Sequence, residues 1–126
     1  MAEAFQRETR QRRAIRRVLL DSSRPLTPEE VQALGQRDVP GLGLATVYRN
    51  VKLLAEEGWL SMVELPGSPV RYELAERPHH HHFLCTSCDQ AFDVHSCPPE
   101  VETMAPSGFA VESHEIILYG LCPTCT

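Results

Sequence analysis

The apolar residues in the first half of the chain recur at helical spacing. The clearest case is GLGLATVYRNVKLLAEEG, where one apolar stripe is formed by Leu44, Val47, Val51 and Leu54. Gly58 fits the C-terminal stop of this helix. An earlier helix is predicted over residues 5–20, where Ile15, Val18 and Leu19 lie among six arginines. Each of these helices would bury one face against a common core.

A shorter helix is predicted between these two. Thr27 can cap it, Pro28 suits its first position, and Glu30 completes a Ser/Thr-x-x-Glu capping box. Gly35 would end it. After the third helix, WLSMVEL and VRYEL are typical of short strands, and PGSP between them is typical of a tight turn. Three helices followed by a β-hairpin predict a winged helix–turn–helix, whose third helix enters the major groove of DNA.

On such a fold, DNA contacts are expected from polar residues off the apolar stripe. Arg49 is the best candidate for a base contact, because arginine reads guanine edges with two hydrogen bonds. Tyr48 lies at the margin of the stripe, where it either touches a thymine methyl group or a phosphate, or packs at the edge of the core. In the first helix, Arg12 and Arg13 are expected to meet phosphates or the minor groove. The alternative for these arginines is a solvated helix face.

Charged and metal-ligating residues are unequally distributed along the 126 residues. Through residue 60, ten Lys/Arg face eight Asp/Glu, and from residue 61 two face nine, so the two parts carry +2 and −7 within a net charge of −5. All five cysteines and all six histidines lie beyond residue 78. This separation predicts two modules with different roles, of which the first suits a nucleic acid.

Targeting signals are missing from the pattern. No apolar run approaches the roughly 20 residues of a membrane span, and the charged start MAEAFQRETRQRR has no signal-peptide core. We therefore expect a cytoplasmic protein with no membrane partner. Disulfides rarely persist in the cytoplasm, so Cys-x-x-Cys pairs are expected to hold metal.

Two such knuckles, CTSC and CPTC, supply four thiolates from Cys85, Cys88, Cys122 and Cys125. They predict a tetrahedral structural zinc site that pins the C-terminal tail near the first knuckle and stabilises a small module. The alternative is two reactive thiol pairs. Cys97 has no knuckle partner, and we expect it to be a small buried packing residue.

Four consecutive histidines precede the first knuckle in RPHHHHFLCTSC. Side chains on a strand alternate between faces, so His79 and His81 would point one way, and His80 and His82 the other. Such a strand could serve two metal sites. Further ligands would come from elsewhere, and the nearest candidates are Glu73, Asp93, Glu100 and His114. The alternatives are a solvated loop and a remnant of a tag.

Taken together, these segments resemble the ferric uptake regulator family. The resemblance is carried in chain order by GLATVYRNVKLLAEEGWL, RYEL, HHHHFLCTSC and SHEIILYGLCPTC, which span most of the chain. It implies an α+β fold, with an N-terminal winged helix–turn–helix DNA-binding domain over residues 1–73 and a small α/β dimerisation domain with a four-cysteine zinc site over residues 74–126. It also implies a homodimer that binds a palindromic operator in double-stranded DNA. Most members are repressors that bind DNA when loaded with metal, and they control metal uptake or homeostasis genes.

The resemblance also implies roles for single residues. The four knuckle cysteines match the structural zinc site of many members. The site that bridges the two domains in the family matches Glu73, His80, His82 and Asp93. A second site, within the dimerisation domain, matches His79, His81, Glu100 and His114. The recognition helix matches Thr46, Tyr48 and Arg49, and a basic residue of the first helix matches Arg12. Nitrogen and oxygen ligands suit a regulatory divalent metal such as Zn, Fe or Mn, and also Ni.

Two positions depart from the family pattern. Many members place a histidine of the DNA-binding domain in the bridging site, and the matching residue here is Pro25, whose side chain cannot ligate. Peroxide-sensing members use that histidine as an oxidation target, so Pro25 weighs against the alternative of a peroxide-responsive regulator. Zinc uptake regulators often carry a cysteine shortly before the histidines, where Ala75 and its neighbours offer none.

Two other classes of protein compete with this interpretation. A zinc hydrolase or deaminase would need His-Glu-x-x-His, or His-x-Glu with the deaminase cysteines, and the sequence contains neither. We therefore expect a regulator and not an enzyme. A zinc-binding structural or interaction module without a DNA role predicts that replacing Arg49 disturbs no partner.

Overall fold

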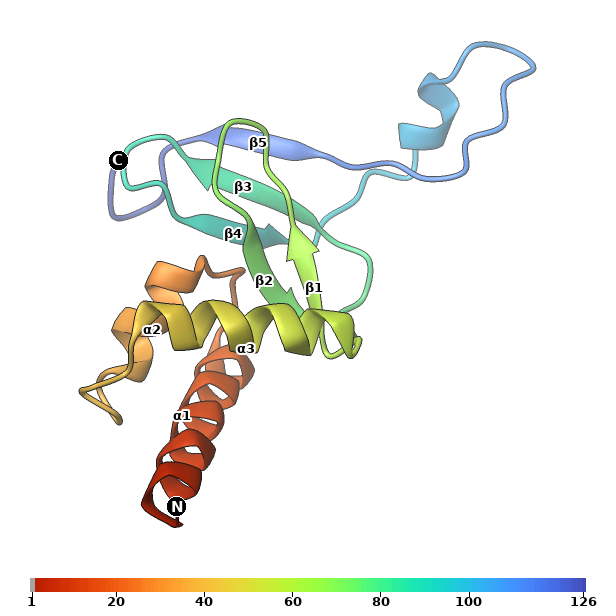
Figure 1. The fold of residues 1–126 in the computed structure, drawn as a ribbon. Helices are drawn as coiled ribbons and strands as arrows, with labels where there is room; N and C mark the ends of the chain where they lie inside the picture. The colour runs from red at the N-terminus through yellow and green to blue at the C-terminus, as the bar shows by residue number, and fades with distance from the viewer. Residues whose placement is uncertain (1) are drawn as a thin grey trace. The chain divides into compact units, whose positions relative to one another are not determined.

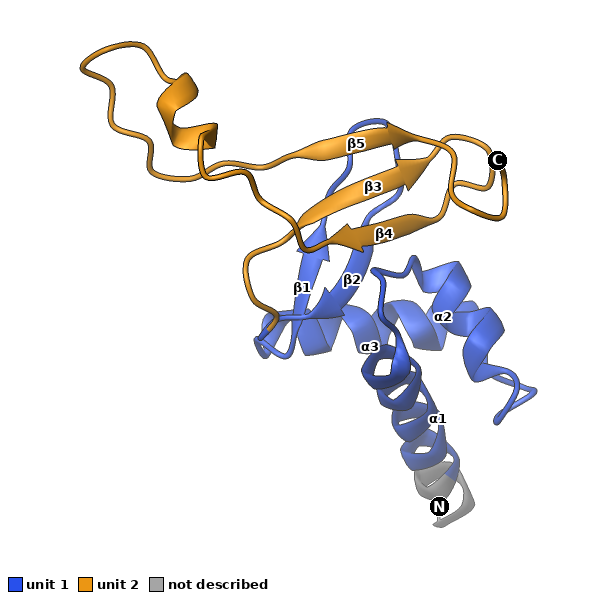
Figure 2. Ribbon diagram, turned by 180° about the vertical axis from the view of Figure 1, so that it is seen from behind, with its two compact units in different colours: residues 1–76 blue, residues 77–126 orange. Residues whose placement is uncertain are grey.

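The computed structural model describes residues 2–126, with side chains from Arg7 onward. The chain divides into two compact units, residues 1–76 (unit 1) and residues 77–126 (unit 2) (Figure 2). The division follows Glu76, whereas the sequence predicts a boundary after Glu73. None of the described helices is both long and apolar enough to cross a membrane.

Unit 1 contains three helices and an antiparallel hairpin (Figure 1), namely α1 (Ala2–Asp21), α2 (Pro28–Gly35), α3 (Leu44–Glu56), β1 (Leu60–Val63) and β2 (Arg71–Leu74). This order is the winged helix–turn–helix that the sequence predicts. On α3, Val47, Val51 and Leu54 are buried and Leu44 is half-buried, so the predicted stripe faces the core. Gly58 follows α3 with a φ of +83°, a left-handed conformation that glycine adopts without strain.

An apolar core holds unit 1 together. Two backbone hydrogen bonds between Leu26 and Tyr72, of 3.0 and 2.8 Å, join the segment before α2 to β2. Each fully buried aliphatic side chain contributes about 1.5–3 kcal/mol relative to exposure, and members of this core come from every helix and strand of the unit. The buried members are Ile15, Leu19, Leu26, Val31, Leu42, Val47, Val51, Leu54, Leu60 and Tyr72.

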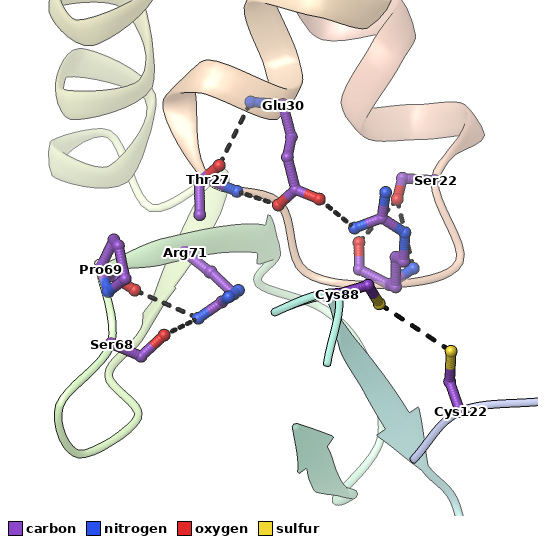
Figure 3. Close-up of polar contacts among 9 residues, drawn as sticks. Ser22, Thr27, Glu30, Ser68, Pro69, Arg71, Cys88 and Cys122 are labelled. Atoms are coloured by element: carbon purple, nitrogen blue, oxygen red, sulfur yellow. Dashed lines mark hydrogen bonds and ion pairs between the residues drawn. The ribbon is translucent and has the colours of Figure 1, made fainter. Parts of the chain in front are cut away.

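The capping box predicted from TPEE is confirmed (Figure 3). The Glu30 N–H donates to Thr27 Oγ1 at 3.2 Å, and the Thr27 N–H donates to Glu30 Oε1 at 3.0 Å. Arg24 Nη1 donates to the other oxygen of the same carboxylate at 2.7 Å. In the hairpin, Arg71 Nη1 donates to Ser68 Oγ at 2.5 Å, which ties the turn to β2. Side-chain hydrogen bonds therefore fix the start of α2 and the turn of the hairpin.

Unit 2 contains a three-stranded sheet in the order β4–β3–β5 and one short 3-10 helix. Its elements are β3 (His81–Cys85), β4 (Ala91–Val94), η1 (Val101–Met104) and β5 (Ile117–Gly120). β3 is antiparallel to β4 and parallel to β5. The C-terminal ends of β3 and β5 therefore lie side by side at one end of the sheet. The start of β3 lies at the other end, beside the end of β4 and the start of β5 (Figure 1). With helices in unit 1 and mixed sheets, the chain is α+β, as predicted.

Unit 2 buries few apolar side chains. Within residues 77–126 the buried hydrophobic ones are Leu84, Cys85, Ala91 and Cys122. Phe83 packs over Gly120, where an added Cβ would stand 3.1 Å from the ring. That close approach explains why glycine ends β5. The sheet is too small to form an extensive apolar core of its own.

Candidate metal sites and DNA-binding surface

Four thiols meet at the end of the sheet where β3 and β5 terminate. Cys85 is the last residue of β3, Cys88 lies in the turn to β4, and Cys122 and Cys125 follow β5. The four sulfurs all lie within 4.8 Å of one another. The Sγ atoms of Cys88 and Cys122 are 3.9 Å apart (Figure 3). The parallel pairing of β3 with β5 thus brings together two knuckles that are far apart in the sequence.

The thiols of this four-cysteine cluster differ in their affinity for protons. The N–H groups of Cys88 and Cys122 donate to Cys85 Sγ at 3.5 and 3.4 Å, and these bonds lower the pKa of Cys85 to about 6. A hydrogen bond with Ser87 lowers the pKa of Cys125, but the neighbouring thiols outweigh it and raise that pKa to about 12. Once Cys85 is a thiolate, ionising the neighbouring thiols is opposed by charge repulsion unless a cation is present. A tetrahedral thiolate set of this kind fits zinc.

A second cluster lies on one face of β3 and β4. Asp93 of β4 stands opposite His82 of β3, so the two side chains share a face. Asp93 Oδ1 is 3.5 Å from His80 Nε2 and 3.7 Å from His82 Nε2. Arg77 donates a hydrogen bond to Asp93 Oδ2 and so orients the carboxylate. One carboxylate oxygen and two imidazole nitrogens converge, a donor set that suits a divalent metal.

Hydrogen bonding prepares His80 to be a ligand. Its Nδ1 lies 2.8 Å from the carbonyl oxygen of Pro78, which can only accept, so Nδ1 carries the proton. The lone pair is then on Nε2, the atom that faces Asp93. Glu73, the fourth residue predicted for this site, lies on β2 of unit 1, and its side chain is buried. Arg77 is a participant that sequence reasoning missed, because nothing in its spacing marks it.

The opposite face carries a third cluster, so the four histidines alternate as predicted. His79 and His81 lie on this face with ring centroids 4.6 Å apart, whereas the rings of His80 and His82 pair on the other face at 4.9 Å. His114 joins the first pair from the segment before β5, with its centroid 4.8 Å from that of His79. Burial, followed by the neighbouring imidazoles, lowers the pKa of His81 and so favours its neutral form.

The fourth member of this cluster is Cys97, whereas the sequence predicts Glu100. Cys97 Sγ lies 3.3 Å from His81 Nε2 and 3.2 Å from His114 Nε2. Among the described residues, the group within 4.8 Å contains Cys97 and not Glu100, which is exposed at the start of η1. The expectation that Cys97 is a buried packing residue is wrong, because it is half-buried beside imidazoles. Antiparallel pairing of β4 with β3 places the residues after β4 beside the start of β3, and a prediction of this pairing could have identified Cys97.

The predicted DNA-contacting residues lie on the surface of α1 and α3. Arg12, Thr46 and Arg49 line one hollow of 810 Å³ together with two further cationic side chains. Arg13 lines a neighbouring hollow with Arg12 and three more arginines of α1. Tyr48 is 46% exposed, which places it on the surface and not at the core edge. Basic side chains from two helices therefore line these hollows, beside Glu8 and Glu56, and could contact phosphates.

A carboxylate lies beside this surface. The Tyr48 hydroxyl donates to Glu29 Oε1 of α2 at 2.9 Å. This hydrogen bond is the main reason that the pKa of Tyr48 is raised. The phenol is thereby held against α2, although the residue is half exposed.

The sequence pattern of the Ferric uptake regulator family matches residues 3–119 of the chain. The chain belongs to this family. It is therefore a metal-responsive, DNA-binding transcriptional regulator, as its residues predict. Members of the ferric uptake regulator family regulate transcription and are not enzymes.

Known members of the family are similar to this chain over most of its length. A ferric uptake regulation protein of Campylobacter jejuni is 32% identical over 93% of this chain and 78% of its own. The Helicobacter pylori ferric uptake regulator, described as having three functional metal-binding sites, has a TM-score of 0.70 and 28% identity, covering 91% of this chain and 79% of its own. A zinc-bound manganese uptake regulator has a TM-score of 0.78 and 28% identity, covering 89% and 87%.

Proposed function

We propose that the protein is a metal-dependent transcriptional repressor that binds a palindromic operator in double-stranded DNA as a homodimer. The single observation that best supports it is the convergence of His80, His82 and Asp93, with His80 already in the tautomer that a metal ligand needs. These three residues would hold the regulatory divalent ion, Zn, Fe or Mn. A protein that works on operator DNA would act in the cytoplasm, and no catalytic role is proposed.

The structural ion is proposed to be zinc, held by Cys85, Cys88, Cys122 and Cys125. The donor chemistry supports this, because four clustered thiols with unequal proton affinities suit a tetrahedral cation. The zinc-bound relative is consistent with it. When bound, the ion would compensate the charge of four thiolates.

Glu73 is proposed as the fourth ligand of the regulatory site. The proposal rests on the sequence match and on the burial of a carboxylate at that position of β2. Pro25 is buried, and its side chain has no donor atom for a metal. The histidine ligand that many family members have at this position is therefore missing here. This absence argues against the alternative of a peroxide-responsive regulator.

For DNA, we propose that α3 enters the major groove. Arg49 would read a base edge, Thr46 and Tyr48 would contact the groove wall, and Arg12 and Arg13 of α1 would neutralise phosphates. The dimer is proposed to form through unit 2. There β5 is an edge strand and carries the exposed side chains Leu118 and Tyr119, which a second copy would cover.

The metal can favour DNA binding only through a difference in its affinity for the two states of the protein. His80→Ala removes one of three converging donors and should abolish most of the metal dependence of operator binding without unfolding the chain. The measurement is operator affinity for each of Zn, Mn and Fe at buffered free-metal concentrations. The matched control is His95→Ala, because His95 is exposed and, although its ring centroid lies 6.1 Å from that of His80, it belongs to none of the metal-ligating clusters among the described residues. An unaltered metal response in His80→Ala would remove this site from the proposal.

Arg49→Ala tests the DNA-binding half of the proposal. Loss of a bidentate base contact should weaken operator binding by about 1–3 kcal/mol per half-site and relax sequence preference, with the dimer intact. Arg37→Ala is the control, since Arg37 is exposed and lines neither hollow. Equal operator affinity in both variants would favour a zinc-binding module without a DNA role.

A further inference from the structure

We propose that Cys97, His79, His81 and His114 form a thiolate-containing zinc site that is distinct from the other two clusters. The sequence alone predicts an oxygen ligand, Glu100, for this site. The inference rests on the proposed function in one respect only, namely that the chain responds to metal. It adds the identity of a ligand and, through that ligand, the metal that the site prefers.

The distances between donor atoms match tetrahedral coordination. His79 Nε2 lies 3.2 Å from both His81 Nε2 and His114 Nε2, and Cys97 Sγ lies 3.3 Å and 3.2 Å from the Nε2 atoms of His81 and His114. In a tetrahedron, bonds of about 2.0–2.1 Å to nitrogen and about 2.3 Å to sulfur separate neighbouring donors by roughly 3.3–3.6 Å. An ion therefore fits after an outward shift of a few tenths of an ångström.

The topology of unit 2 builds this site from three segments. His79 and His81 lead into β3, Cys97 follows the antiparallel β4, and His114 precedes the parallel β5. The three segments meet at the start of β3. This is the end of the sheet opposite the four-cysteine cluster. Cys97 and His114 are half-buried, and His81 is 2% exposed, so the donors are partly shielded from water.

His81 is the ligand that must change most when the ion binds. The Ile116 N–H donates to its Nδ1 at 3.1 Å, so the neutral ring carries its proton on Nε2, which faces Cys97. Ligation of a neutral imidazole through Nε2 requires the proton to move to Nδ1, which breaks the hydrogen bond from the Ile116 N–H. His79, Cys97 and His114 are therefore the three principal ligands, and His81 is the weakest of the four.

A thiolate changes which metal the site selects. Soft sulfur ligands favour zinc, whereas a carboxylate oxygen suits manganese and other hard ions. The cluster of His80, His82 and Asp93 on the other face of β3 contains no sulfur. A single strand thus carries one sulfur-containing and one oxygen-containing site, and the two should differ in metal preference.

Cobalt(II) distinguishes these sites, because only thiolate ligation produces a near-ultraviolet sulfur-to-cobalt charge-transfer band. The 126-residue chain, with its four-cysteine cluster loaded with zinc, is titrated with cobalt while zinc release is monitored. We expect a thiolate band equivalent to one sulfur per chain, which is absent in Cys97→Ser. Loss of an outer-shell partner typically weakens metal binding roughly 10- to 100-fold. Because Cys97 is a direct ligand, Cys97→Ser should weaken zinc binding at this site by at least as much.

Glu100→Gln is the matched variant, since Glu100 is the ligand that the sequence predicts. The proposal expects Glu100→Gln to keep both the band and the zinc affinity of the unmodified protein. It is overturned if the unmodified protein shows no thiolate band, or if Glu100→Gln loses affinity while Cys97→Ser does not. A band that persists in Cys97→Ser would mean exchange at the four-cysteine cluster and would equally overturn it. Because the readout needs no DNA, failure here leaves operator binding by the protein to be judged separately.

Discussion

The two units of this chain are stabilised in different ways. Unit 1 surrounds a continuous apolar core to which all three helices and both strands contribute. Unit 2 buries only four hydrophobic residues within residues 77–126, and two of them are the zinc-site candidates Cys85 and Cys122. Three clusters of metal-ligating side chains are instead arranged around its three-stranded sheet.

The difference reflects the size of each unit. A module shorter than about 60 residues buries too little surface for a core to outweigh the conformational entropy of the chain, and metals commonly supply the rest. Because structural zinc binds only the folded arrangement of its ligands, its binding free energy becomes folding free energy. The regulatory half of this protein would then depend on metal for its structure as well as for its signal.

Removal of the structural zinc should produce the largest effect. Cys122→Ser deletes one of four thiolates, and the resulting loss is a large part of the roughly 10 kcal/mol that structural zinc contributes in small modules. We expect the sheet of unit 2 to unfold while α1, α2 and α3 persist. Hydrogen exchange followed by NMR would show loss of protection confined to residues 77–126.

Thr124→Ala is the control, because Thr124 is exposed within the same knuckle. It should retain zinc and full protection. If Cys122→Ser kept the unit 2 amides protected, the apolar contacts of the sheet would suffice, and the contrast between the units would disappear.

The reverse experiment weakens unit 1. Leu19 is 1% exposed and its neighbour Leu20 is 53% exposed. Leu19→Ala should lower the free energy of unfolding of unit 1 by about 2–5 kcal/mol through lost burial and a cavity, with zinc content unchanged. Denaturant unfolding monitored at Trp59, which packs against this core, measures the loss.

Leu20→Ala should change the same quantity by no more than about 0.5 kcal/mol, the usual range for surface positions. If Leu19→Ala also released zinc from unit 2, the two units would be energetically coupled. The contrast would then describe one cooperative structure instead of two independent ones.

The same division explains what the sequence could predict. In unit 1 the stripe on α3, the Thr27–Glu30 capping box and Gly58 are local signals, and each predicts its element without knowledge of the rest of the chain. The hairpin follows from two short strand patterns around PGSP. Elements of this kind are encoded within a few residues, so periodicity and capping suffice to place them.

The metal clusters of unit 2 depend on strand pairing as well as on local pattern. Alternation alone separated His79 and His81 from His80 and His82, and knuckle spacing alone selected the four cysteines. The choice of Cys97 over Glu100 required the antiparallel return of β4, and Arg77 became visible only through its hydrogen bond to Asp93. Such partners are fixed by register between segments that are distant in sequence.

The units should also differ in their response to pH, with an effect of a few kcal/mol. The pKa values of Cys88 and Cys125 are raised, that of Cys125 to about 12, so both hold protons in the metal-free protein below pH 9. Zinc must displace at least these two protons, and its affinity should therefore rise by no less than about 100-fold per pH unit between pH 6 and 8, or about 2.7 kcal/mol. Competition with a zinc chelator at several pH values measures this slope.

Unit 1 provides the internal control, because it contains neither histidine nor cysteine. The pKa values of Tyr48 and Tyr72 are raised above 10.0, the first mainly by the hydrogen bond to Glu29 and the second by burial. A raised folded-state pKa contributes stability that is complete below pH 10 and is lost as the pH rises through the folded value. The unfolding transition of unit 1 should therefore stay level from pH 6 to 8 while zinc affinity in unit 2 rises. If the stability of unit 1 instead rose with pH as the zinc affinity of unit 2 does, unit 1 would owe part of its stability to the metal. Acid would then destabilise the DNA-binding helices through loss of zinc.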